Sequence, residues 1–455
     1  MSDTFKIRST SNPQNNTLVM TQRLLSIFCI VLLGGCGEVP RFGTQRQFAE
    51  DAPQEQPAQT ATMPVALSAA KSQTPQFPVY RDPPQTDSSI VIGLDADMTS
   101  GSAVSGEAIR RGVVLAVDEL NRDGGLLGRP VELVVRDHRG NPDRGIANMR
   151  EFAAMRDVLA VVGGIHTPVA LQELPTIHEH ELIYLGPWAA GTGVVANGYA
   201  PNFVFRVSVR DEYAGGFLVR KALEKGYRRP GLLLERTGWG RSNEQAILEA
   251  LQRRNLSPVA VEWLNWGEQD LTRQISRLSK AKADVILLVA NPLEGVAAAR
   301  AVAAIEDEKP AIISHWGISA GKFFELARPF IKDVELTFLQ TYSFVKPRYP
   351  QRSQPLYEMY AARFPDCETP ADIFSPVGTA HAYEIVRMLA AATRQAGTLD
   401  SRTVAVELER LMDYSGVIRD YPQPFHPDHH DALTEDDFIL ARYNDSGVIV
   451  PVDEN

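Results

Sequence analysis

The chain has 455 residues, of which 44% are hydrophobic and 22% are charged, and its formal net charge is −10. These proportions are those of soluble globular proteins, so a chain that is disordered throughout is excluded. Only one long apolar run is present, near the N-terminus, which excludes a membrane protein with several spans. The acidic balance also argues against a nucleic-acid-binding surface, which needs a basic stripe.

The first 35 residues have the pattern of a bacterial export signal. Lys6, Arg8 and Arg23 precede an apolar run over residues 24–33, which is too short to span a bilayer. The run ends in Leu-Gly-Gly-Cys, which resembles the lipobox of bacterial lipoproteins. We therefore predict that Cys36 is lipidated and becomes the mature N-terminus, which anchors the protein to a membrane.

Residues 37–87 differ in composition from everything that follows. They are rich in Pro, Gln, Thr and Ala and have no sustained apolar periodicity, so burial cannot offset the entropy of ordering them. We predict that residues 36–87 comprise the lipidated cysteine and a disordered tether to a folded body that begins at residue 88. Met20 is an alternative start to Met1, because it would give a signal of ordinary length.

Alternating strands and helices begin at residue 88. Short apolar runs predict buried strands, and apolar residues spaced by three and four predict a helix over residues 107–121. Asn141-Pro142 and Thr167-Pro168 have the pattern of helix starts. The strands predicted in this part of the chain are 88–94, 131–135, 158–162, 182–185 and 204–207.

The alternation restarts after residue 207. It predicts parallel sheets covered by helices on both faces, and its length calls for two doubly wound α/β lobes. The strands predicted here are 231–235, 258–264, 284–290, 311–314 and 334–342. The helices between them are 212–226, 242–254, 269–280, 293–306 and 319–328. The chain closes with helices near 352–363, 371–394 and 401–413 and strand-like segments near 417–419, 437–443 and 447–451.

A family resemblance rests first on residues 106–142, whose sequence is GEAIRRGVVLAVDELNRDGGLLGRPVELVVRDHRGNP. This segment is similar to the opening of the periplasmic solute-binding proteins of the branched-chain amino-acid (Leu/Ile/Val-binding) type, which serve ATP-binding-cassette (ABC) transporters. The later segments 161–170, 184–192, 235–241, 288–295 and 314–319 follow in the family's order and spacing. The resemblance implies a type I periplasmic binding protein fold, in which two lobes joined by three crossings close on a ligand.

The resemblance also implies how the chain is divided between the lobes. Residues 88–208 and 343–436 would form the N-terminal lobe, and residues 209–342 and 437–455 the C-terminal lobe. The crossings would lie near 207–210, 341–345 and 434–438.

Ligands of open α/β sheets bind beyond the carboxyl ends of the strands. The loops at those ends offer helix starts that suit an anion and small residues that let a ligand approach the main chain. The resemblance assigns an α-carboxylate to Thr167, Ala189 and Ala190, with helix capping as the alternative role of Thr167. The predicted ligand-binding residues are Asp97, Ser105, His166, Thr167, Trp188, Ala189, Ala190, Gly191, Trp239, Asn291, Glu294, His315 and Trp316.

Three of the five tryptophans, Trp188, Trp239 and Trp316, lie in these loops, which predicts a shared aromatic wall. By the resemblance, Trp239 takes a position that is usually Tyr and covers the ligand. Trp316 takes the place of an acid that commonly pairs with the ligand's ammonium group. Either a cation–π contact replaces that acid, or the ligand lacks an ammonium, or Trp316 only packs the base of its lobe.

Other polar residues of these loops have open roles. Asp97 or Glu294 could pair with a cation instead, whereas Glu235 is expected to orient its loop. His166 and His315 are candidate donors to a polar ligand group, with bonding to the backbone as the alternative.

Two further features outside the loops are expected to be structural. No third ligand converges for a metal, and the His-rich segment 425–436 is expected to be structural or solvated. Cys367, in the polar stretch RFPDCETP, is expected to be a surface or half-buried thiol.

The sequence contains no GxSxG, HExxH, GxGxxG or P-loop motif, so neither an enzyme nor a cofactor is predicted. The first hypothesis is a lipid-anchored receptor of the bacterial cell envelope, facing the periplasm or the exterior. It would bind an amino acid, amide or related small carboxylate and deliver it to the permease subunits of an ABC importer. The second is a ligand-sensing module for a signalling partner. The third is an outer-membrane lipoprotein that regulates cell-wall synthases by protein contact. An open cleft favours the first two hypotheses and a plugged cleft the third.

Overall fold

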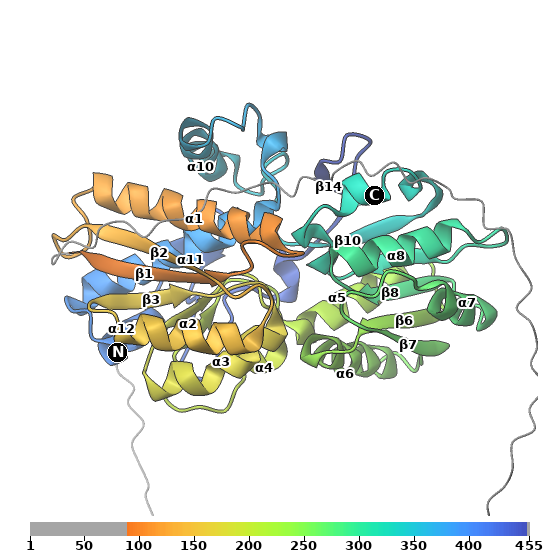
Figure 1. The fold of residues 1–455 in the computed structure, drawn as a ribbon, viewed down its shortest axis with the longest axis horizontal. Coiled ribbons are helices and arrows are strands. Elements are labelled where there is room, and N and C mark those ends of the chain that lie inside the picture. Colours follow the sequence, from red (N-terminus) through yellow and green to blue (C-terminus); the bar gives the residue numbers. More distant parts are fainter. Residues whose placement is uncertain (1–88, 453–455) are drawn as a thin grey trace, which may run out of the picture. The chain divides into compact units, whose positions relative to one another are not determined.

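The computed structural model describes residues 89–452, which contain two large sheets, each covered by its own helices, and a small two-stranded sheet (Figure 1). The predicted export signal, the lipidation site Cys36 and the tether lie outside these residues. One sheet has five strands in the order β2-β1-β3-β4-β5, and the other has seven in the order β14-β13-β10-β9-β8-β6-β7. Of the helices within residues 89–452, none has the length and apolar character needed to cross a membrane.

The five-stranded sheet forms the N-terminal lobe, and all its strand pairs are parallel. Its strands are β1 (Ile90–Ala96), β2 (Val131–Asp137), β3 (Val158–Val162), β4 (Tyr184–Gly186) and β5 (Val204–Arg206). The helices of this lobe are α1 (Ala103–Arg122), α2 (Pro142–Ala154), α3 (Thr167–Glu179), α4 (Thr192–Val195), α10 (Pro350–Arg363), α11 (Pro376–Ala396) and α12 (Ser401–Glu409).

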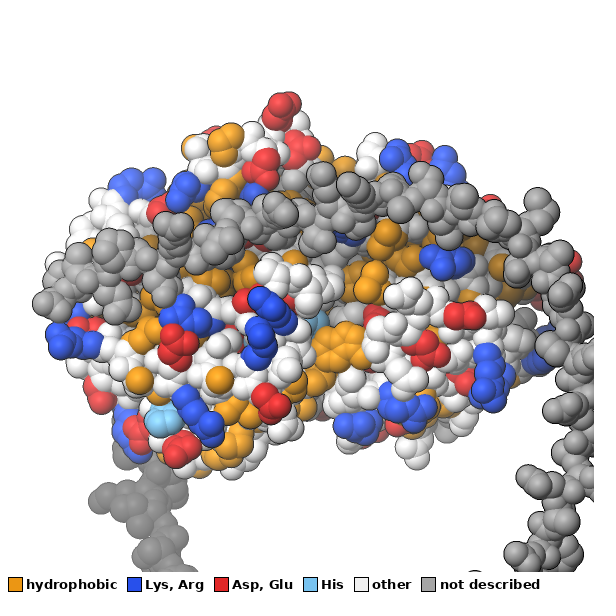
Figure 2. Space-filling view, viewed as in Figure 1, with side chains coloured by type: hydrophobic (Ala, Val, Ile, Leu, Met, Phe, Trp, Pro, Cys, Tyr) orange, Lys and Arg blue, Asp and Glu red, His pale blue; other side chains and the backbone are white. Residues whose placement is uncertain are grey.

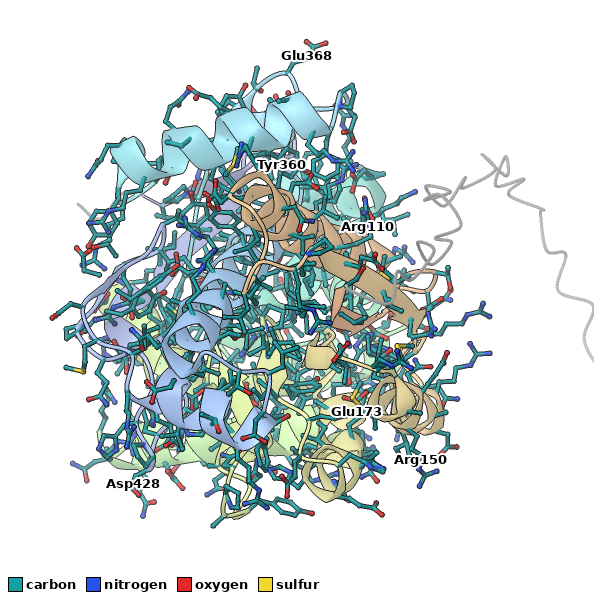
Figure 3. The ribbon with its side chains drawn as sticks, turned by 90° about the vertical axis from the view of Figure 1, so that its left-hand side faces the viewer. Arg110, Arg150, Glu173, Tyr360, Glu368 and Asp428 are labelled. Atoms are coloured by element: carbon teal, nitrogen blue, oxygen red, sulfur yellow. The ribbon has the colours of Figure 1, made fainter. Side chains whose placement is uncertain are left out.

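Close packing of α1 against α11 joins the early and late parts of the chain in this lobe. A Cβ on Gly112 of α1 would lie 2.3 Å from the Thr379 carbonyl oxygen of α11, so only glycine allows this approach. The Thr379 hydroxyl donates to the Ala108 carbonyl at 3.1 Å. Figure 3 looks onto this lobe, with α10, which carries Tyr360, lying above α1, which carries Arg110.

The seven-stranded sheet forms the C-terminal lobe, and only β13 and β14 run antiparallel to their neighbours. Its strands are β6 (Pro230–Glu235), β7 (Ala260–Leu264), β8 (Val285–Val289), β9 (Ala311–Ser314), β10 (Leu336–Gln340), β13 (Ile439–Tyr443) and β14 (Ile449–Pro451). Its helices are α5 (Asp211–Glu224), α6 (Gly238–Gln252), α7 (Thr272–Lys280), α8 (Pro292–Ala303) and α9 (Phe323–Ala327).

The predicted fold class, two doubly wound α/β lobes, is confirmed, with local corrections. The helix predicted from residue 107 begins at Ala103, because its first turn is made of small and polar residues that show no apolar period. The helix predicted over 319–328 is a 3₁₀-helix, Trp316–Ala320, followed by α9. The strand predicted near 417–419 is wrong, since these residues form the turn between two short strands. Those strands are β11 (Tyr414–Ser415) and β12 (Asp420–Tyr421).

The remaining short helices are Ile331–Asp333, Pro370–Asp372 and Glu435–Asp437. Near the second of them, Cys367 is buried, rather than at the surface or half-buried as expected, because it packs in the hydrophobic core. Its thiol donates to the Thr369 carbonyl oxygen at 3.3 Å. Burial raises the pKa of the Cys367 thiol to about 11, so it stays protonated at neutral pH.

The His-rich segment 425–436 packs against the edge strand of the N-terminal lobe. His430 stacks on Phe205 with ring centroids 4.1 Å apart, and its Nδ1 lies 2.9 Å from the Val204 carbonyl oxygen. No group of His, Cys, Asp and Glu side chains within residues 89–452 has the arrangement of a metal site. The His-rich segment therefore makes structural contacts with β5.

Candidate functional site

Loops that follow strands of both lobes meet and enclose a small cavity, here called the inner cavity. The space that the centre of a water molecule can occupy is about 10 Å³, so the inner cavity has room for about one water molecule. The N-terminal lobe contributes the loops after β3 and β4, and the C-terminal lobe contributes residues that follow β6, β8 and β9. The predicted residues that line it are His166, Thr167, Trp188, Ala190, Trp239, Asn291 and Trp316.

A wider crevice, here called the cleft mouth, adjoins the inner cavity and has a volume of about 270 Å³. His166 and Asn291 line both spaces, so the two are neighbours across these side chains. Of the predicted residues, Asp97, His166, Asn291 and Glu294 line the mouth. Figure 2 shows hydrophobic side chains along the line where the two lobes meet.

The structure brings the three predicted tryptophans together. Trp188 of the N-terminal lobe stacks on Trp316 of the C-terminal lobe, with ring centroids 4.9 Å apart and planes at 29°. The indole N–H of Trp239 donates to Asp211 at 3.3 Å, and its ring meets the His315 ring edge-on at 5.1 Å. All three indole rings line the inner cavity, which accounts for its small volume.

Thr167 does not cap its helix. His166 is the residue at the cap position, and the Thr167 hydroxyl instead accepts from the backbone N–H of Gly191 at 3.0 Å. A hydroxyl from α3 and a backbone donor from the β4–α4 loop are therefore paired with each other at the wall of the inner cavity. Both groups are of the kind that can bind a carboxylate once they are parted.

A buried arginine holds the β4–α4 loop from behind. Arg206, at the end of β5, donates to the carbonyl oxygens of Ala189 at 3.0 Å and Gly191 at 2.8 Å. Its Nε donates to Asp431 at 2.5 Å, and both side chains are fully buried. Sequence reasoning missed this pair, although an arginine inside the apolar run VFRV was a usable signal.

Asp97 organises the loop between β1 and α1. Its carboxylate accepts from the backbone N–H groups of Ser100 at 2.8 Å and Ser102 at 3.0 Å, and lies 3.2 Å from Nε2 of His166. Burial opposes ionisation, but the hydrogen bonds from His166 and Ser100 outweigh it and hold the pKa of Asp97 well below its usual range. The Asp97 carboxylate is thus ionised, and its hydrogen bonds are already formed with groups of the protein.

Two acids on the C-terminal side behave differently. Glu235 accepts from Asn291 at 2.6 Å and from Thr237 at 3.0 Å. Burial and repulsion from Glu294 nevertheless raise the pKa of Glu235 to about 7. Glu294 accepts from the backbone N–H of Gly267 at 2.5 Å, and burial raises its pKa as well. Both carboxylates are almost completely buried.

A second pair of buried acids lies inside the N-terminal lobe, away from the cleft lining. Burial and the nearby Glu173 raise the pKa of Asp95 well above its ordinary value, and burial raises the pKa of Glu173 to about 7. A Cβ at Gly145 would lie 2.3 Å from a Glu173 oxygen, so α2 and α3 meet closely there. In Figure 3 Glu173 lies inside the lobe, whereas Arg150 and Asp428 lie at its edge.

Four predicted residues line neither space. Ser105 is in α1 rather than in a loop, and its hydroxyl lies 2.7 Å from that of Ser375. His315 is fully buried behind Trp239, with Nε2 3.2 Å from Asp211. Ala189 and Gly191 offer their carbonyl oxygens to Arg206, so these two residues support the β4–α4 loop.

Sequence reasoning missed Trp266, which lines the cleft mouth. It lies in the loop between β7 and α7, and its ring reaches the other lobe, with its centroid 4.8 Å from that of His166. A Cβ at Gly140 would lie 3.2 Å from the Trp266 ring, so the ring packs closely against this glycine of the N-terminal lobe. Trp266 is 41% exposed, and its place between polar residues in NWGEQD was a usable signal.

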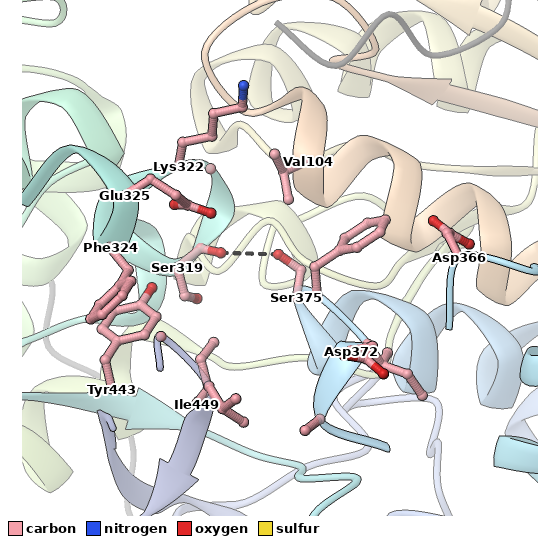
Figure 4. Close-up of a pocket in the computed structure, with 16 residues that line it drawn as sticks. Val104, Ser319, Lys322, Phe324, Glu325, Asp366, Asp372, Ser375, Tyr443 and Ile449 are labelled. Atoms are coloured by element: carbon pink, nitrogen blue, oxygen red, sulfur yellow. Dashed lines mark hydrogen bonds between the residues drawn. The ribbon is translucent and has the colours of Figure 1, made fainter. Parts of the chain in front are cut away.

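A separate cavity of about 340 Å³ lies elsewhere between the lobes (Figure 4). Phe324, Tyr443 and Ile449 line it from the C-terminal lobe, and the Ser375 hydroxyl at its wall donates to the Ser319 carbonyl oxygen at 2.9 Å. None of the predicted ligand-binding residues lines this cavity. Despite its size, most of its lining comes from α9, from residues 366–375 and from residues 443–449 rather than from the strand-exit loops, and we do not place the ligand there.

Comparison with known proteins decides the family. The sequence matches the family described as "Periplasmic binding protein" over residues 89–447. The chain belongs to the periplasmic binding protein family. This result confirms the resemblance inferred from residues 106–142 and from the loop segments that follow them.

Several curated relatives are named as Leu/Ile/Val-binding proteins. One from Rhizobium johnstonii, named Leu/Ile/Val-binding protein BraC3, is 25% identical over 331 residues, which cover 72% of this chain and 85% of the relative. A "Leu/Ile/Val-binding protein homolog 2" from Brucella abortus is 24% identical, and the match covers 73% of this chain and 85% of the relative.

Solved structures of periplasmic binding proteins share the fold. A type 1 periplasmic binding protein from Bordetella pertussis has a TM-score of 0.72 at 22% identity and covers 80% of this chain and 99% of its own. The branched-chain amino acid binding protein LivJ of Streptococcus pneumoniae, in complex with isoleucine, has a TM-score of 0.67 at 19% identity. The match covers 80% of this chain and 100% of the LivJ chain. A solute-binding protein from R. palustris in complex with 4-hydroxybenzoate has a TM-score of 0.67 at 16% identity. The match covers 79% of this chain and 95% of that protein's chain.

Proposed function

We propose that this periplasmic binding protein is an extracytoplasmic receptor that binds a small solute between its lobes and delivers it to the permease subunits of an ABC importer. The solute would be an amino acid, an amide or a related small carboxylate. The observation that carries the proposal is that loops of both lobes jointly line the inner cavity and the mouth, with His166 and Asn291 in both. As a receptor, the protein would act without catalysis or a cofactor, in keeping with relatives named as binding proteins.

The solute would enter when the lobes part. Parting separates Trp188 from Trp316, which now line the inner cavity, and a solute carboxylate would then replace the hydrogen bond between the Thr167 hydroxyl and the Gly191 N–H within the N-terminal lobe. These donors would then bind a carboxylate, and the indoles would pack on the rest of the solute. Closure would follow because only the closed form lets one solute contact both lobes at once.

A thermal-shift screen of the mature protein tests the proposal. Amino acids, amides, small carboxylates and aromatic acids are added singly, in large excess over the protein. A solute present at 100 times its Kd stabilises the folded state by about 2.7 kcal/mol, so the Tm rises measurably. A rise with one chemical class supports the receptor proposal, and no rise with any class at millimolar concentration would contradict it.

A second function is favoured by one observation. The inner cavity is almost filled by aromatic rings, as expected for a chain that kept the fold but acts through protein contacts, such as a lipoprotein regulator of cell-wall synthases. For that function, no small solute should raise the Tm. A ligand-sensing module would respond to a solute as a receptor does, and is separated from it by whether uptake of the solute requires this protein.

Attachment to the cell envelope through lipidated Cys36 is part of the proposal. Cys36→Ser should abolish incorporation of labelled fatty acid and release the exported protein from the membrane fraction. Incorporation of fatty acid into the Cys36→Ser variant would contradict the lipid anchor, whatever the outcome of the solute screen.

A further inference from the structure

Two buried carboxylates face the cleft from the C-terminal lobe without a basic partner. Glu235 and Glu294 are each 1% exposed, and neither forms an ion pair with Lys or Arg within residues 89–452. Glu235 lines the inner cavity and Glu294 lines the mouth, on either side of Asn291, which lines both. Burying two like charges near each other is unfavourable unless a positive charge compensates them.

One oxygen of Glu294 has no hydrogen-bond partner. Its Oε1 accepts from the backbone N–H of Gly267 at 2.5 Å, whereas Oε2 is buried and is bonded to no group of the described chain. Both oxygens of Glu235, by contrast, accept from side chains, namely Asn291 and Thr237. An unsatisfied buried carboxylate oxygen beside a cavity is an acceptor that lacks its donor, so Glu294 is the residue open to a ligand.

Aromatic rings stand beside both acids. Trp266 lines the mouth together with Glu294, and Trp239 lines the inner cavity together with Glu235. Indole faces attract ammonium and guanidinium groups, whereas they do not bind metal ions in the manner of His, Cys or carboxylate ligands. The surroundings therefore fit an organic cation.

We propose that the solute carries an ammonium or guanidinium group separated from its carboxylate, and that Glu294 holds this group at the cleft mouth beside Trp266. This inference rests on the proposed function, since it assigns the solute class of the same cleft. The separation follows from the placement of the groups. Thr167 lines the inner cavity, with the Gly191 N–H bonded to its hydroxyl, whereas Glu294 lies at the mouth.

The position of Trp316 strengthens this assignment. It lies in the inner cavity in contact with Trp188, and both oxygens of Glu235, the acid that lines this cavity, are already hydrogen-bonded. An ammonium directly beside the carboxylate would therefore meet an indole and no free carboxylate oxygen. An ammonium several bonds away would reach the unpaired oxygen of Glu294 instead. A charge-assisted hydrogen bond to a buried acid is stronger than a neutral one, so the cation should contribute much of the affinity.

Three probes of equal chain length test the proposal in the mature protein by calorimetric titration: pentanoate, 2-aminopentanoate and 5-aminopentanoate. We expect 5-aminopentanoate to bind at least about tenfold more tightly than the other two, as one charge-assisted hydrogen bond implies. Glu294→Gln keeps the shape of the side chain and should remove this preference. The matched control is Glu325→Gln, because Glu325 is exposed and lines the separate cavity, and it should keep the preference.

Trp266→Ala is a second variant, at an exposed position, and should reduce the preference without a loss of Tm. Equal or tighter binding of pentanoate or 2-aminopentanoate, or an unchanged preference in Glu294→Gln, would overturn the inference and leave the receptor function standing. If no probe binds and the solute screen also gives no Tm rise, both the inference and the proposed function are rejected. If the screen finds only solutes without a cation, the inference alone is rejected.

Discussion

The two faces of the cleft differ in how their charges are satisfied. On the N-terminal face, Asp97 is bonded to serine N–H groups and His166, and Arg206 is paired with Asp431. On the C-terminal face, Glu235 and Glu294 repel each other, and neither forms an ion pair with Lys or Arg within residues 89–452. The carboxylates of the N-terminal face therefore already have their partners, whereas those of the C-terminal face have no Lys or Arg to balance them. This difference suits a receptor in which the N-terminal face is preformed, and in which the acids of the C-terminal face receive a cation from the solute when the lobes close.

The largest expected effect tests the completeness of the N-terminal face. Arg206→Met leaves the buried Asp431 with only Arg210, whose guanidinium lies 3.1 Å away, and frees two carbonyl oxygens of the β4–α4 loop. Breaking a buried ion pair on one side costs about 3–5 kcal/mol, so the free energy of unfolding in urea should fall by that amount. Arg402→Ala is the control, because it removes an exposed ion pair with Glu181 and should leave the free energy of unfolding almost unchanged. A loss below 1 kcal/mol for Arg206→Met would contradict the comparison.

The next effect tests the incompleteness of the C-terminal face. Burial and Glu294 raise the pKa of Glu235 from 4.5 to about 7, so its contribution to stability is fully present below pH 4.5 and is lost as the pH rises to about 7. Glu235→Gln removes this dependence. Relative to the wild type, its free energy of unfolding should therefore rise by about 2–3 kcal/mol between pH 4.5 and pH 8. The same difference measured for exposed Glu325→Gln is the control, and parallel pH curves for Glu235→Gln and wild type would show that the C-terminal face is already balanced.

A smaller effect is expected where the two faces meet. Trp316→Ala removes the ring that stacks on Trp188 and should weaken solute affinity by about 1–3 kcal/mol, as for a buried aromatic wall. The same range is expected for Trp239→Ala. Trp263→Ala is the control, because Trp263 lies in β7 and lines neither the inner cavity nor the mouth. Unchanged calorimetric Kd values in both cleft variants would place these indoles in packing roles only.

The smallest effect concerns one hydroxyl of the N-terminal face. Thr167→Ala removes the acceptor of the Gly191 N–H and one donor to a carboxylate, which should weaken solute binding by about 1 kcal/mol. Thr192→Ala is a nearby control, since the Thr192 hydroxyl accepts from the backbone N–H of Glu212 at 3.1 Å and the residue lines neither space. Equal Kd values for the wild type and Thr167→Ala would assign the hydroxyl to the β4–α4 loop alone.

Much of the fold could be predicted because its strands are continuous apolar runs. The runs 158–162 and 311–314 coincide with β3 and β9, since burial on both faces of a parallel sheet favours apolar residues along nearly the whole strand. The start of α1 could not be predicted, because Ser and Gly in its first turn carry no apolar period. The short pair β11 and β12 was missed because two-residue strands have no pattern of their own.

The candidate site could be predicted only in outline. Strand-exit loops identify Trp188, Trp239 and Trp316 as neighbours, because the carboxyl ends of parallel strands share one edge. They cannot separate residues that line the cleft from those behind it, such as His315, because side-chain direction is set by packing. The run VFRV could point to Arg206 as a buried arginine, but its partner Asp431 lies 225 positions away, so no local pattern could identify the pair.

The most direct test of solute binding between the lobes is a titration of intrinsic tryptophan fluorescence with the solute that raises the Tm most. Because Trp188 and Trp316 belong to opposite lobes and stack at 4.9 Å, a solute in the inner cavity must change their surroundings. The account predicts a saturable change in the emission spectrum, with a midpoint equal to the calorimetric Kd, and a much smaller change in Trp316→Ala. A Tm rise with no change in tryptophan emission would mean that the solute binds elsewhere and would contradict the account.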